Sequence, residues 1–282
     1  MKGYEKNLLN CEQKKQNKMK ENQFLIDYYK NSCDEDNRLL TKCGSVEFVT
    51  TMRYIEKYIM PGNRVIEIGA GTGRYSHALA RQGYVVDAVE LVEHNIEVFR
   101  QNTQPNENVT ITQGNAMDLS DFPDNEYDIT LLLGPLYHLY NKKDKKKALR
   151  EAIRVTKQGG VIFAAYVISD ACVLDEGFKR SNFDVAEYIE KGMIDPVTFA
   201  TKSEPQELFE LVRKEHIDDL ISIFPVTRLH YVASDGYARH MQEAVDAMDD
   251  NRFELYLQYH FATCEREDLI GITSHAIDIF RK

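Results

Sequence analysis

The glycine-rich turn Gly69-Ala70-Gly71-Thr72-Gly73 constrains the fold more than any other segment of the chain. It follows the apolar run 64–68, which has the length and residue types of a buried strand, and it precedes residues 74–81, which have helical spacing. A strand that turns at once into a helix needs residues that tolerate positive φ and a backbone that a ligand can approach closely. The first N–H groups of such a helix attract an anionic group, so the turn predicts a ligand site.

Around this turn, short strand-like runs alternate with amphipathic helices. We predict strands at 64–68, 84–90, 109–113, 127–133 and 161–167, with helices at 74–81, 93–102 and 144–156. Later segments add a strand at 225–233, a helix at 236–259 and a final strand region at 269–281. This alternation is typical of βαβ units. We therefore predict an α/β protein with a doubly wound, mostly parallel, seven-stranded sheet.

The same patterns divide the chain into five parts. Residues 1–20 are polar and are expected to be a flexible tail, and residues 21–62, with helical patterns at 23–30 and 45–60, are interpreted as an N-terminal helical lid. Residues 63–168 are the predicted cofactor-binding core. Residues 169–224 are charged and mostly helical, without a clear strand, and are interpreted as an insertion that caps the substrate site. Residues 225–282 are expected to complete the core.

The spacing of the glycines separates the classes of nucleotide-binding fold. The dinucleotide fingerprint GxGxxG/A requires a third small residue, and Arg74 holds that position. No Gly-Lys-Ser/Thr follows, which excludes a P-loop. Glu67 lies one residue from the end of the first strand, where a carboxylate can meet a cationic amino group near the turn. NAD has no such amine there, whereas the methionine moiety of S-adenosylmethionine (SAM) does.

Residues 65–76 (VIEIGAGTGRYS) resemble motif I of the class I, Rossmann-like, SAM-dependent methyltransferases. Further segments resemble this family in the expected order: GNAM at 114–117, LLLGPLYHL at 131–139 and QGGVIFAA at 158–165. The resemblance covers residues 61–167 and implies that SAM is the cofactor. It implies a cofactor site formed by Glu67, Gly69, Ala70, Gly71, Gly73, Glu90, Leu91, Asn115, Ala116, Met117 and Leu133. Glu90 stands where the family has its ribose-binding acid, and Asn115 replaces the usual adenine-binding Asp.

The segment after the fourth strand bears on the methyl acceptor. Enzymes of this family that methylate adenine amino groups or glutamine amides carry Asn/Asp-Pro-Pro-aromatic there, whereas this chain has Gly134-Pro135-Leu136-Tyr137. The spermidine-synthase relatives need an acid in this turn, and none is present. The GPLYHL string and the C-terminal residues 266–276 resemble a bacterial subgroup that acts on small molecules. A small-molecule acceptor is therefore predicted.

Methyl transfer from a sulfonium is an in-line displacement, so alignment of the reactants and exclusion of water supply most of the acceleration. A base is needed only if the acceptor arrives protonated. His138 is the candidate base and Tyr137 a second catalytic candidate; a cofactor-binding or structural role for His138 stays open. Tyr28 and Tyr29 are interpreted as part of a lid, or else as core-packing aromatics, and Tyr140 as a residue that shapes the pocket. His275 is interpreted as a hydrogen-bonded structural residue.

Composition excludes several classes of partner. The net charge of −10 disfavours nucleic acid, and the lysine-rich run 142–147 is interpreted as a solvated helix face. The five cysteines show no CxxC spacing and the eight histidines no HExxH or HxxxH spacing, so neither a disulfide framework nor a metal site is predicted. No apolar run approaches the roughly 20 residues of a membrane span, and free thiols fit a cytoplasmic location. An RNA or protein acceptor and a non-catalytic SAM-binding module stay open as alternatives.

Overall fold

The computed structural model describes residues 23–30, 40–205 and 208–282, so the tail predicted at 1–20 lies outside the described residues. At its centre is a sheet with the strand order β3-β2-β1-β4-β5-β8-β7, to which the short strand β6 adds by pairing with β5. The strands are β1 (Arg64–Ile68), β2 (Val85–Glu90), β3 (Val109–Gln113), β4 (Tyr127–Leu132), β5 (Thr156–Ile168), β6 (Leu211–Val212), β7 (Thr227–Ala233) and β8 (His275–Arg281).

Most neighbouring strands of this sheet are parallel. β1 pairs in parallel with β2 and β4, β2 with β3, and β4 with β5. β8 is antiparallel to both β5 and β7, between which it lies. The predicted mostly parallel α/β fold is therefore confirmed. Among the described residues, seven strands form the continuous path as predicted, and β6 adds a further two-residue strand at the end of β5, with Val167 opposite Leu211 and Ile168 opposite Val212.

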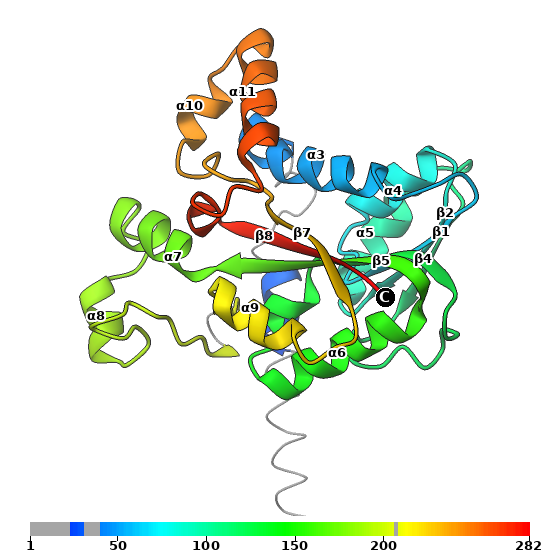
Figure 1. Ribbon diagram of the computed structural model, residues 1–282, viewed down its shortest axis with the longest axis horizontal. Helices are drawn as coiled ribbons and strands as arrows, with labels where there is room; N and C mark the ends of the chain where they lie inside the picture. Colours follow the sequence, from blue (N-terminus) through cyan, green and yellow to red (C-terminus); the bar gives the residue numbers. More distant parts are fainter. Residues whose placement is uncertain (1–22, 31–39, 206–207) are drawn as a thin grey trace, which may run out of the picture.

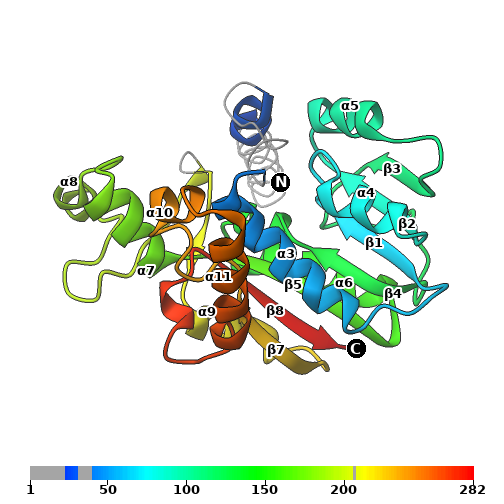
Figure 2. The ribbon, with the colours of Figure 1, turned by 90° about the horizontal axis from the view of Figure 1, so that it is seen from above.

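Helices cover both faces of the sheet. In Figures 1 and 2, α3 (Lys42–Glu56), α4 (Arg74–Arg81) and α5 (Glu93–Asn102) lie on one face, and α6 (Lys142–Val155) and α9 (Lys214–Ile221) on the other. Within the described ranges, none of the helices combines the length and the apolarity that crossing a bilayer requires. The sheet is buried between the two layers, and Tyr127, Phe163 and Phe280 are among its fully buried side chains. Each such side chain contributes about 1.5–3 kcal/mol through burial.

The prediction of one continuous helix over residues 236–259 is wrong. The structure has two helices, α10 (Gln242–Asp246) and α11 (Asp250–Thr263). The Asp249 side chain accepts a hydrogen bond from the Arg252 backbone N–H at 2.8 Å, so it caps the start of a second helix. The hydrophobic pattern runs across this boundary, which is why spacing alone predicted one helix.

The segment interpreted as an insertion begins at Ser169, directly after β5. Its described elements are α7 (Ser169–Cys172), a π-helical segment η2 (Val173–Lys179), α8 (Val185–Glu190), β6 and α9. In Figure 1, α7 and α8 extend beyond the arrowhead of β5. The expectation that this region has no strand is wrong only for β6, which is too short to give a period-2 signal.

The interpretation of the lysine-rich run as a solvated face needs one correction. Lys142 and Lys143 are exposed, but Lys145 is buried and forms an ion pair with Glu210 in the insertion. Burial lowers the pKa of Lys145 to about 8. One lysine of the run therefore joins α6 to the insertion and does not contribute to a basic surface.

A buried ion pair joins β7 to β8, and its loss is expected to destabilise the sheet. Arg228 donates to both carboxylate oxygens of Asp278 at 2.7 and 2.8 Å, and the Asp278 side chain is fully buried. Arg228→Ala would leave this carboxylate without a cation, which costs about 3 kcal/mol or more in the free energy of unfolding. Urea unfolding measures the loss. Arg266→Ala is the control: it removes an exposed ion pair with Asp268 and is expected to leave the unfolding midpoint unchanged. An equal loss of unfolding free energy in the two variants would show that the buried pair does not stabilise the sheet.

Candidate functional site

The predicted glycine turn connects β1 to α4. Its backbone is left-handed at Gly69, Gly71 and Gly73, with φ of 75°, 56° and 95°. A Cβ on Gly73, the N-cap residue of α4, would lie 2.5 Å from the Phe99 ring. No atom of the described residues lies within 4 Å of a Cβ built on Gly71, so at that residue the turn has backbone that a ligand can approach.

Glu90 ends β2 beside this turn. Its carboxylate accepts hydrogen bonds from the backbone N–H of Gly71 at 2.8 Å, from the N–H of Val92 at 2.9 Å and from the Asn95 amide at 3.4 Å. Burial raises the pKa of Glu90, and these donors oppose the rise. Because a carboxylate has about four acceptor positions, capacity remains for a hydroxyl donor.

Glu67, on β1, is a second buried carboxylate in the same region. One of its oxygens accepts from the backbone N–H of Ser76 at 2.9 Å and from the Ser76 hydroxyl. Burial raises the pKa of Glu67 to about 8, and the nearby Glu90 adds to this. In the described part of the chain, neither carboxylate pairs with a lysine or arginine. Two buried carboxylates without a lysine or arginine partner favour a ligand that carries a cationic group or hydroxyl donors.

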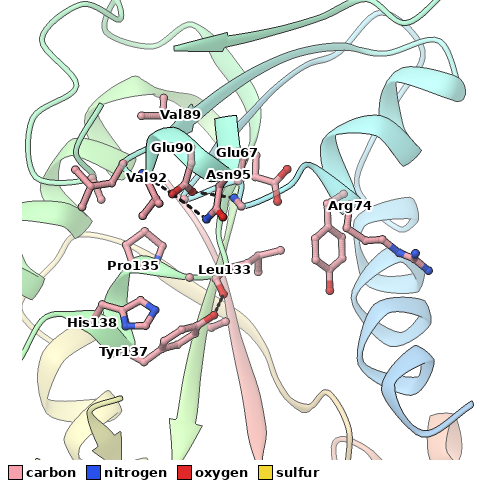
Figure 3. A pocket seen from close by; sticks show the side chains of 18 of the residues that line it. Glu67, Arg74, Val89, Glu90, Val92, Asn95, Leu133, Pro135, Tyr137 and His138 are labelled. Atoms are coloured by element: carbon pink, nitrogen blue, oxygen red, sulfur yellow. Dashed lines mark hydrogen bonds between the residues drawn. The ribbon is translucent and has the colours of Figure 1, made fainter. Parts of the chain in front are cut away.

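These groups line one cavity of about 150 Å³ at the carboxyl ends of β1, β2 and β4. Figure 3 shows Glu67, Glu90 and Asn95 on one side and Pro135, Tyr137 and His138 on the other. The structure brings the following predicted cofactor residues into this lining: Glu67, Gly69, Ala70, Gly71, Glu90, Leu91, Asn115, Ala116, Met117 and Leu133. Gly73 is not part of the lining; it shapes the turn as the N-cap of α4.

Asn115 has a hydrogen bond within its own turn. Its side-chain oxygen accepts from the backbone N–H of Met117 at 2.9 Å. The sequence assigned this oxygen to the adenine amino group, and an amide oxygen has a second lone pair that can still accept from a ligand. The adenine contact therefore stays a prediction, with the local role added to it.

Both ring nitrogens of His138 form hydrogen bonds within the protein. Nδ1 lies 2.7 Å from the carbonyl oxygen of Leu208, to which it donates, and Nε2 lies 3.0 Å from the Tyr29 hydroxyl. Burial lowers the pKa of His138 to about 4. A neutral imidazole with both nitrogens engaged suits a positioning role better than the base role that the sequence suggested.

The predicted tyrosines occupy different places. Tyr29 and Tyr137 line the cavity, and the Tyr137 hydroxyl donates to the carbonyl oxygen of Leu133 at 2.9 Å. Tyr28 lines a second cavity instead. Tyr140 lines neither; its hydroxyl lies 3.5 Å from the carbonyl oxygen of Pro205 in the insertion.

The second cavity, of about 370 Å³, lies between the core and the insertion. Aromatic side chains from the N-terminal helix, the core and the insertion form one part of its wall, and Asp175, Glu176 and Arg239 form another. Tyr29, Tyr137 and His275 line both cavities, so the two meet at these side chains.

Sequence patterns alone did not predict several of the lining residues: Glu47, Thr51, Arg74, Asn95, Ser234, His275 and Ile277. Asn95 carries a local signal, because it lies five residues after Glu90 at the start of a predicted helix. Glu47 and His275 come from opposite ends of the chain and meet only through the sheet topology, with 3.6 Å between a Glu47 carboxylate oxygen and Nδ1 of His275. Among residues 23–30, 40–205 and 208–282, no three His, Cys, Asp or Glu side chains group as metal ligands.

Comparison with known proteins supports the resemblance seen in the sequence. Residues 66–164 match the family model described as a methyltransferase domain. The chain is 33% identical over 141 residues to a demethylmenaquinone methyltransferase from Clavibacter sepedonicus, a match that covers 49% of this chain and 54% of that protein. It is 36% identical over 107 residues to the ubiquinone/menaquinone biosynthesis C-methyltransferase UbiE of Vibrio campbellii, covering 36% and 39%. The chain thus spans about half or less of the curated relatives that it matches.

Solved structures confirm the fold. A SAM-dependent methyltransferase from Methanosarcina mazei aligns with a TM-score of 0.52 and 18% identity over 81% of this chain and 96% of its own. A phosphoethanolamine N-methyltransferase from Haemonchus contortus aligns with a TM-score of 0.56 and 13% identity, covering 93% and 48%. The (4+2)-cyclase SpnF aligns with a TM-score of 0.52 and 16% identity, covering 84% and 81%.

The turn geometry predicts a difference between two left-handed glycines. Gly73→Ala introduces both unfavourable φ, about 1–2 kcal/mol, and overpacking against Phe99, about 1–3 kcal/mol more. Gly62→Ala is the control, because φ at Gly62 is 84° and no atom of the described part of the chain lies within 4 Å of the added Cβ. We expect Gly73→Ala to lower the free energy of unfolding by the larger amount in chemical denaturation. Equal effects would contradict the close approach of Phe99.

Proposed function

Because residues 66–164 match a methyltransferase domain model, we propose that the protein is a SAM-dependent methyltransferase that transfers the methyl group of SAM to a small-molecule acceptor. SAM would bind in the first cavity and the acceptor in the second. One observation carries the proposal: a turn with exposed backbone and two buried carboxylates line a single cavity, and that cavity adjoins another at shared side chains.

The residues of the first cavity fit SAM. Glu90 can accept from the ribose hydroxyls, and Glu67 together with the backbone of the turn can hold the amino-acid end. Leu91, Leu133 and residues 115–117 would contact the adenine. Bound SAM supplies an electrophilic methyl group on a sulfonium. The protein would align the acceptor with this group and keep water out.

The second cavity supports a small, flat acceptor. Among the described residues, the aromatic side chains of Tyr28, Tyr29, Tyr137 and Phe209 line it. Aromatic walls favour a planar ring system. The curated relatives are named as methyltransferases of demethylmenaquinone and of ubiquinone and menaquinone biosynthesis, so a quinone-type ring is the leading class of acceptor.

The helical lid and the substrate cap are part of the proposal. Helix 23–30 contributes Tyr28 and Tyr29 to the second cavity, and the insertion contributes Cys172, Asp175, Glu176, Phe209 and Leu211. These contacts support the roles that the sequence suggested for 21–62 and 169–224. His138 would position Tyr29 through their hydrogen bond, with Tyr140 supporting the insertion.

Two alternatives to a small-molecule methyltransferase are an RNA acceptor and a role in binding without methyl transfer. An RNA acceptor is disfavoured, because Lys145 is buried in an ion pair and the basic run is interrupted. A role in binding without methyl transfer is the second candidate, because SpnF, named as a cyclase, shares the fold and fold alone does not fix chemistry. A screen for methyl transfer separates the two. The absence of a metal requirement and the cytoplasmic location stay predictions.

Binding of SAM tests the proposed cofactor site. Glu90→Ala removes charge-assisted hydrogen bonds to the ribose, so SAM affinity measured by calorimetry should fall on the order of 10²-fold. The control is Glu93→Ala, an exposed residue three positions away, which should bind SAM as the wild type does. Equal affinity in Glu90→Ala and wild type would contradict the assignment.

Glu67 predicts a proton release when SAM binds. With a pKa of about 8, Glu67 is mostly protonated at pH 7, and a cationic amino group beside it favours the ionised form. Binding at pH 7 should therefore release a proton from Glu67, and SAM affinity should increase as the pH rises from 7 towards 8. Calorimetry in two buffers with different ionisation enthalpies measures this release. Glu67→Gln should show no such proton release. An equal release in the wild type and in Glu67→Gln would show that Glu67 is not the group that loses the proton.

A further inference from the structure

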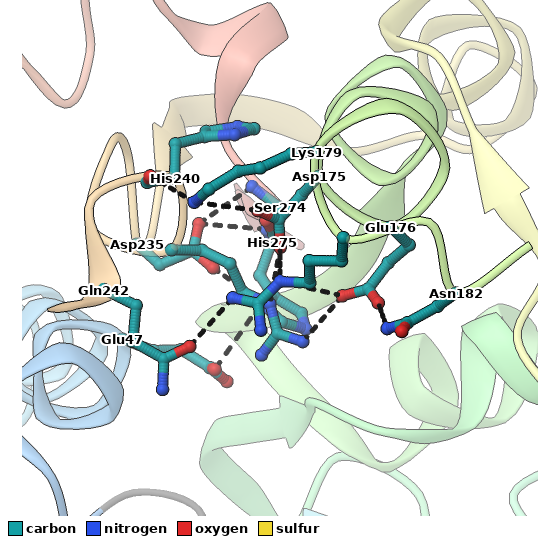
Figure 4. Close-up of polar contacts among 12 residues, drawn as sticks. Glu47, Asp175, Glu176, Lys179, Asn182, Asp235, His240, Gln242, Ser274 and His275 are labelled. Atoms are coloured by element: carbon teal, nitrogen blue, oxygen red, sulfur yellow. Dashed lines mark hydrogen bonds and ion pairs between the residues drawn. The ribbon is translucent and has the colours of Figure 1, made fainter.

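A histidine stands beside a carboxylate at several places in the described part of the chain. Figure 4 shows one such pair, Asp235 and His275, in which Nδ1 of His275 lies 2.8 Å from the Asp235 carboxylate; His275 lines both cavities, so this pair belongs to the site already described. Another pair, His230 and Glu265, lines neither of these cavities. This second pair also contacts the hydroxyl group of a half-buried tyrosine, Tyr58.

Tyr58, His230 and Glu265 form a continuous chain of hydrogen bonds. The Tyr58 hydroxyl lies 2.6 Å from Nε2 of His230, and Nδ1 of His230 lies 2.7 Å from one carboxylate oxygen of Glu265. The other carboxylate oxygen accepts a hydrogen bond from the Tyr54 hydroxyl at 2.5 Å. A hydroxyl group in contact with a base that a third group orients is the arrangement that activates nucleophiles in covalent catalysis.

Three separate elements bring these residues together. Tyr54 is near the end of α3 and Tyr58 follows that helix by two residues, so the two side chains lie on the same side of the chain. His230 lies on β7, the last strand in the sheet order, where the pairing with β8 shifts register between Arg228 and His230. Without this shift, His230 would share a face of the sheet with Arg228. The shift therefore turns His230 towards Tyr58, and Glu265, just after α11, completes the group.

The protonation states follow from these contacts. Burial alone would raise the pKa of Glu265, but the hydrogen bonds with Tyr54 and His230 hold it below its usual value. An ionised Glu265 accepts the proton on Nδ1 of His230, so in the neutral imidazole Nε2 has the lone pair that accepts from the Tyr58 hydroxyl. Burial raises the pKa of Tyr58. This hydroxyl is therefore protonated at neutral pH and needs a base to act as a nucleophile.

A cation lies beside the Tyr58 hydroxyl, and the group is open to solvent. The Arg281 guanidinium is 5.8 Å from the centroid of the Tyr58 ring. Arg281 is exposed, and among the described residues it has no ion-pair partner. A guanidinium of this kind attracts an anionic group on an incoming reagent. The His230 and Glu265 side chains are 20% and 43% exposed, so a reagent can reach them from solvent.

We propose that Tyr58, His230 and Glu265 form a second reactive site, at which the Tyr58 hydroxyl accepts an acyl group from an activated, anionic donor of the acyl phosphate class. The inference does not rest on the proposed methyl transfer. The Tyr58 O–H bond breaks and its proton goes to Nε2 of His230. The phenolic oxygen forms a bond to the acyl carbon, while the bond between that carbon and the phosphate oxygen breaks and its electron pair leaves with phosphate. His230 then passes the proton to water, and the product is an ester on Tyr58.

Acetyl phosphate is the probe that tests this site. Full-length protein is incubated with it, and the acetylation of individual tyrosines is followed by mass spectrometry of peptides. Tyr259 is the internal control, because it is 54% exposed and its hydroxyl contacts no histidine in the described part of the chain. Tyr58 should be acetylated on the order of 10²-fold faster than Tyr259, which is the lower end of what a general base contributes. Equal rates at the two tyrosines would overturn the proposal.

Variants separate base catalysis from mere exposure. His230→Gln should lower the rate at Tyr58 about 10²-fold and leave Tyr259 unchanged. His94→Gln changes an exposed histidine and should leave both rates unchanged. Arg281→Gln should slow the reaction of Tyr58 with acetyl phosphate, which is an anion, but not with 4-nitrophenyl acetate, which is neutral. Equal effects on the two reagents would overturn the anionic class of donor, and an unchanged rate in His230→Gln would overturn the role of the base.

Glu265 is a positioning residue, and its role has a spectroscopic signature. Glu265→Gln keeps the size of the side chain but removes its charge, so acetylation of Tyr58 should slow and the Nδ1 proton of His230 should lose its downfield shift in NMR spectra. An unchanged rate with an unchanged proton signal would refute the orienting role. If His230→Gln does not fold, Glu265→Gln and the comparison of Tyr58 with Tyr259 in the wild type decide, because Glu265 is exposed and the comparison needs no variant.

Discussion

The hydrogen bond from the Gly71 backbone N–H to the Glu90 carboxylate, 2.8 Å long, is the contact on which the rest of the site depends. It joins the turn after β1 to the end of β2, two adjacent parallel strands whose carboxyl ends meet at one edge of the sheet. The bond holds a buried carboxylate beside exposed backbone. Parallel strands in this order leave a crevice at that edge, where ligands of doubly wound folds bind. The position of the first cavity is therefore a consequence of sheet topology, and Glu90 and the glycine turn supply its polar groups.

The second cavity, the proposed acceptor site, depends on β8, which runs antiparallel to β5 and β7. Because β8 is antiparallel, residues 273–275 and the segment after β7 arrive at the same edge as the carboxyl end of β5. The insertion then closes over them, anchored by β6 on β5 and by the ion pair between Lys145 and Glu210. In the proposed function, core residues hold the methyl donor, and elements before and after the core enclose the acceptor.

Much of the fold follows from local pattern, and much of the acceptor site does not. The glycine turn, Glu67 and Glu90 could be predicted because each stands at a fixed offset from a strand with a clear apolar signal. β6 could not, because two residues carry no periodicity, and the break at Asp249 was hidden by continuous helical spacing. The pairing of His275 with Asp235, and the approach of Glu47, join segments far apart in sequence. The neutral state of His138 results from burial, which outweighs the opposing effect of the Leu208 carbonyl oxygen, and the neighbours of His138 in sequence reveal neither.

A crystal structure of the protein with bound S-adenosylhomocysteine tests the central claim most directly. The ribose hydroxyls should lie within hydrogen-bond distance of Glu90, the amino group beside Glu67 and the amino-acid end along the backbone of residues 69–71. The sulfur should face the junction that Tyr29, Tyr137 and His275 share. A nucleoside bound outside this cavity, or inside it with its ribose away from Glu90, would contradict the assignment of the cofactor site.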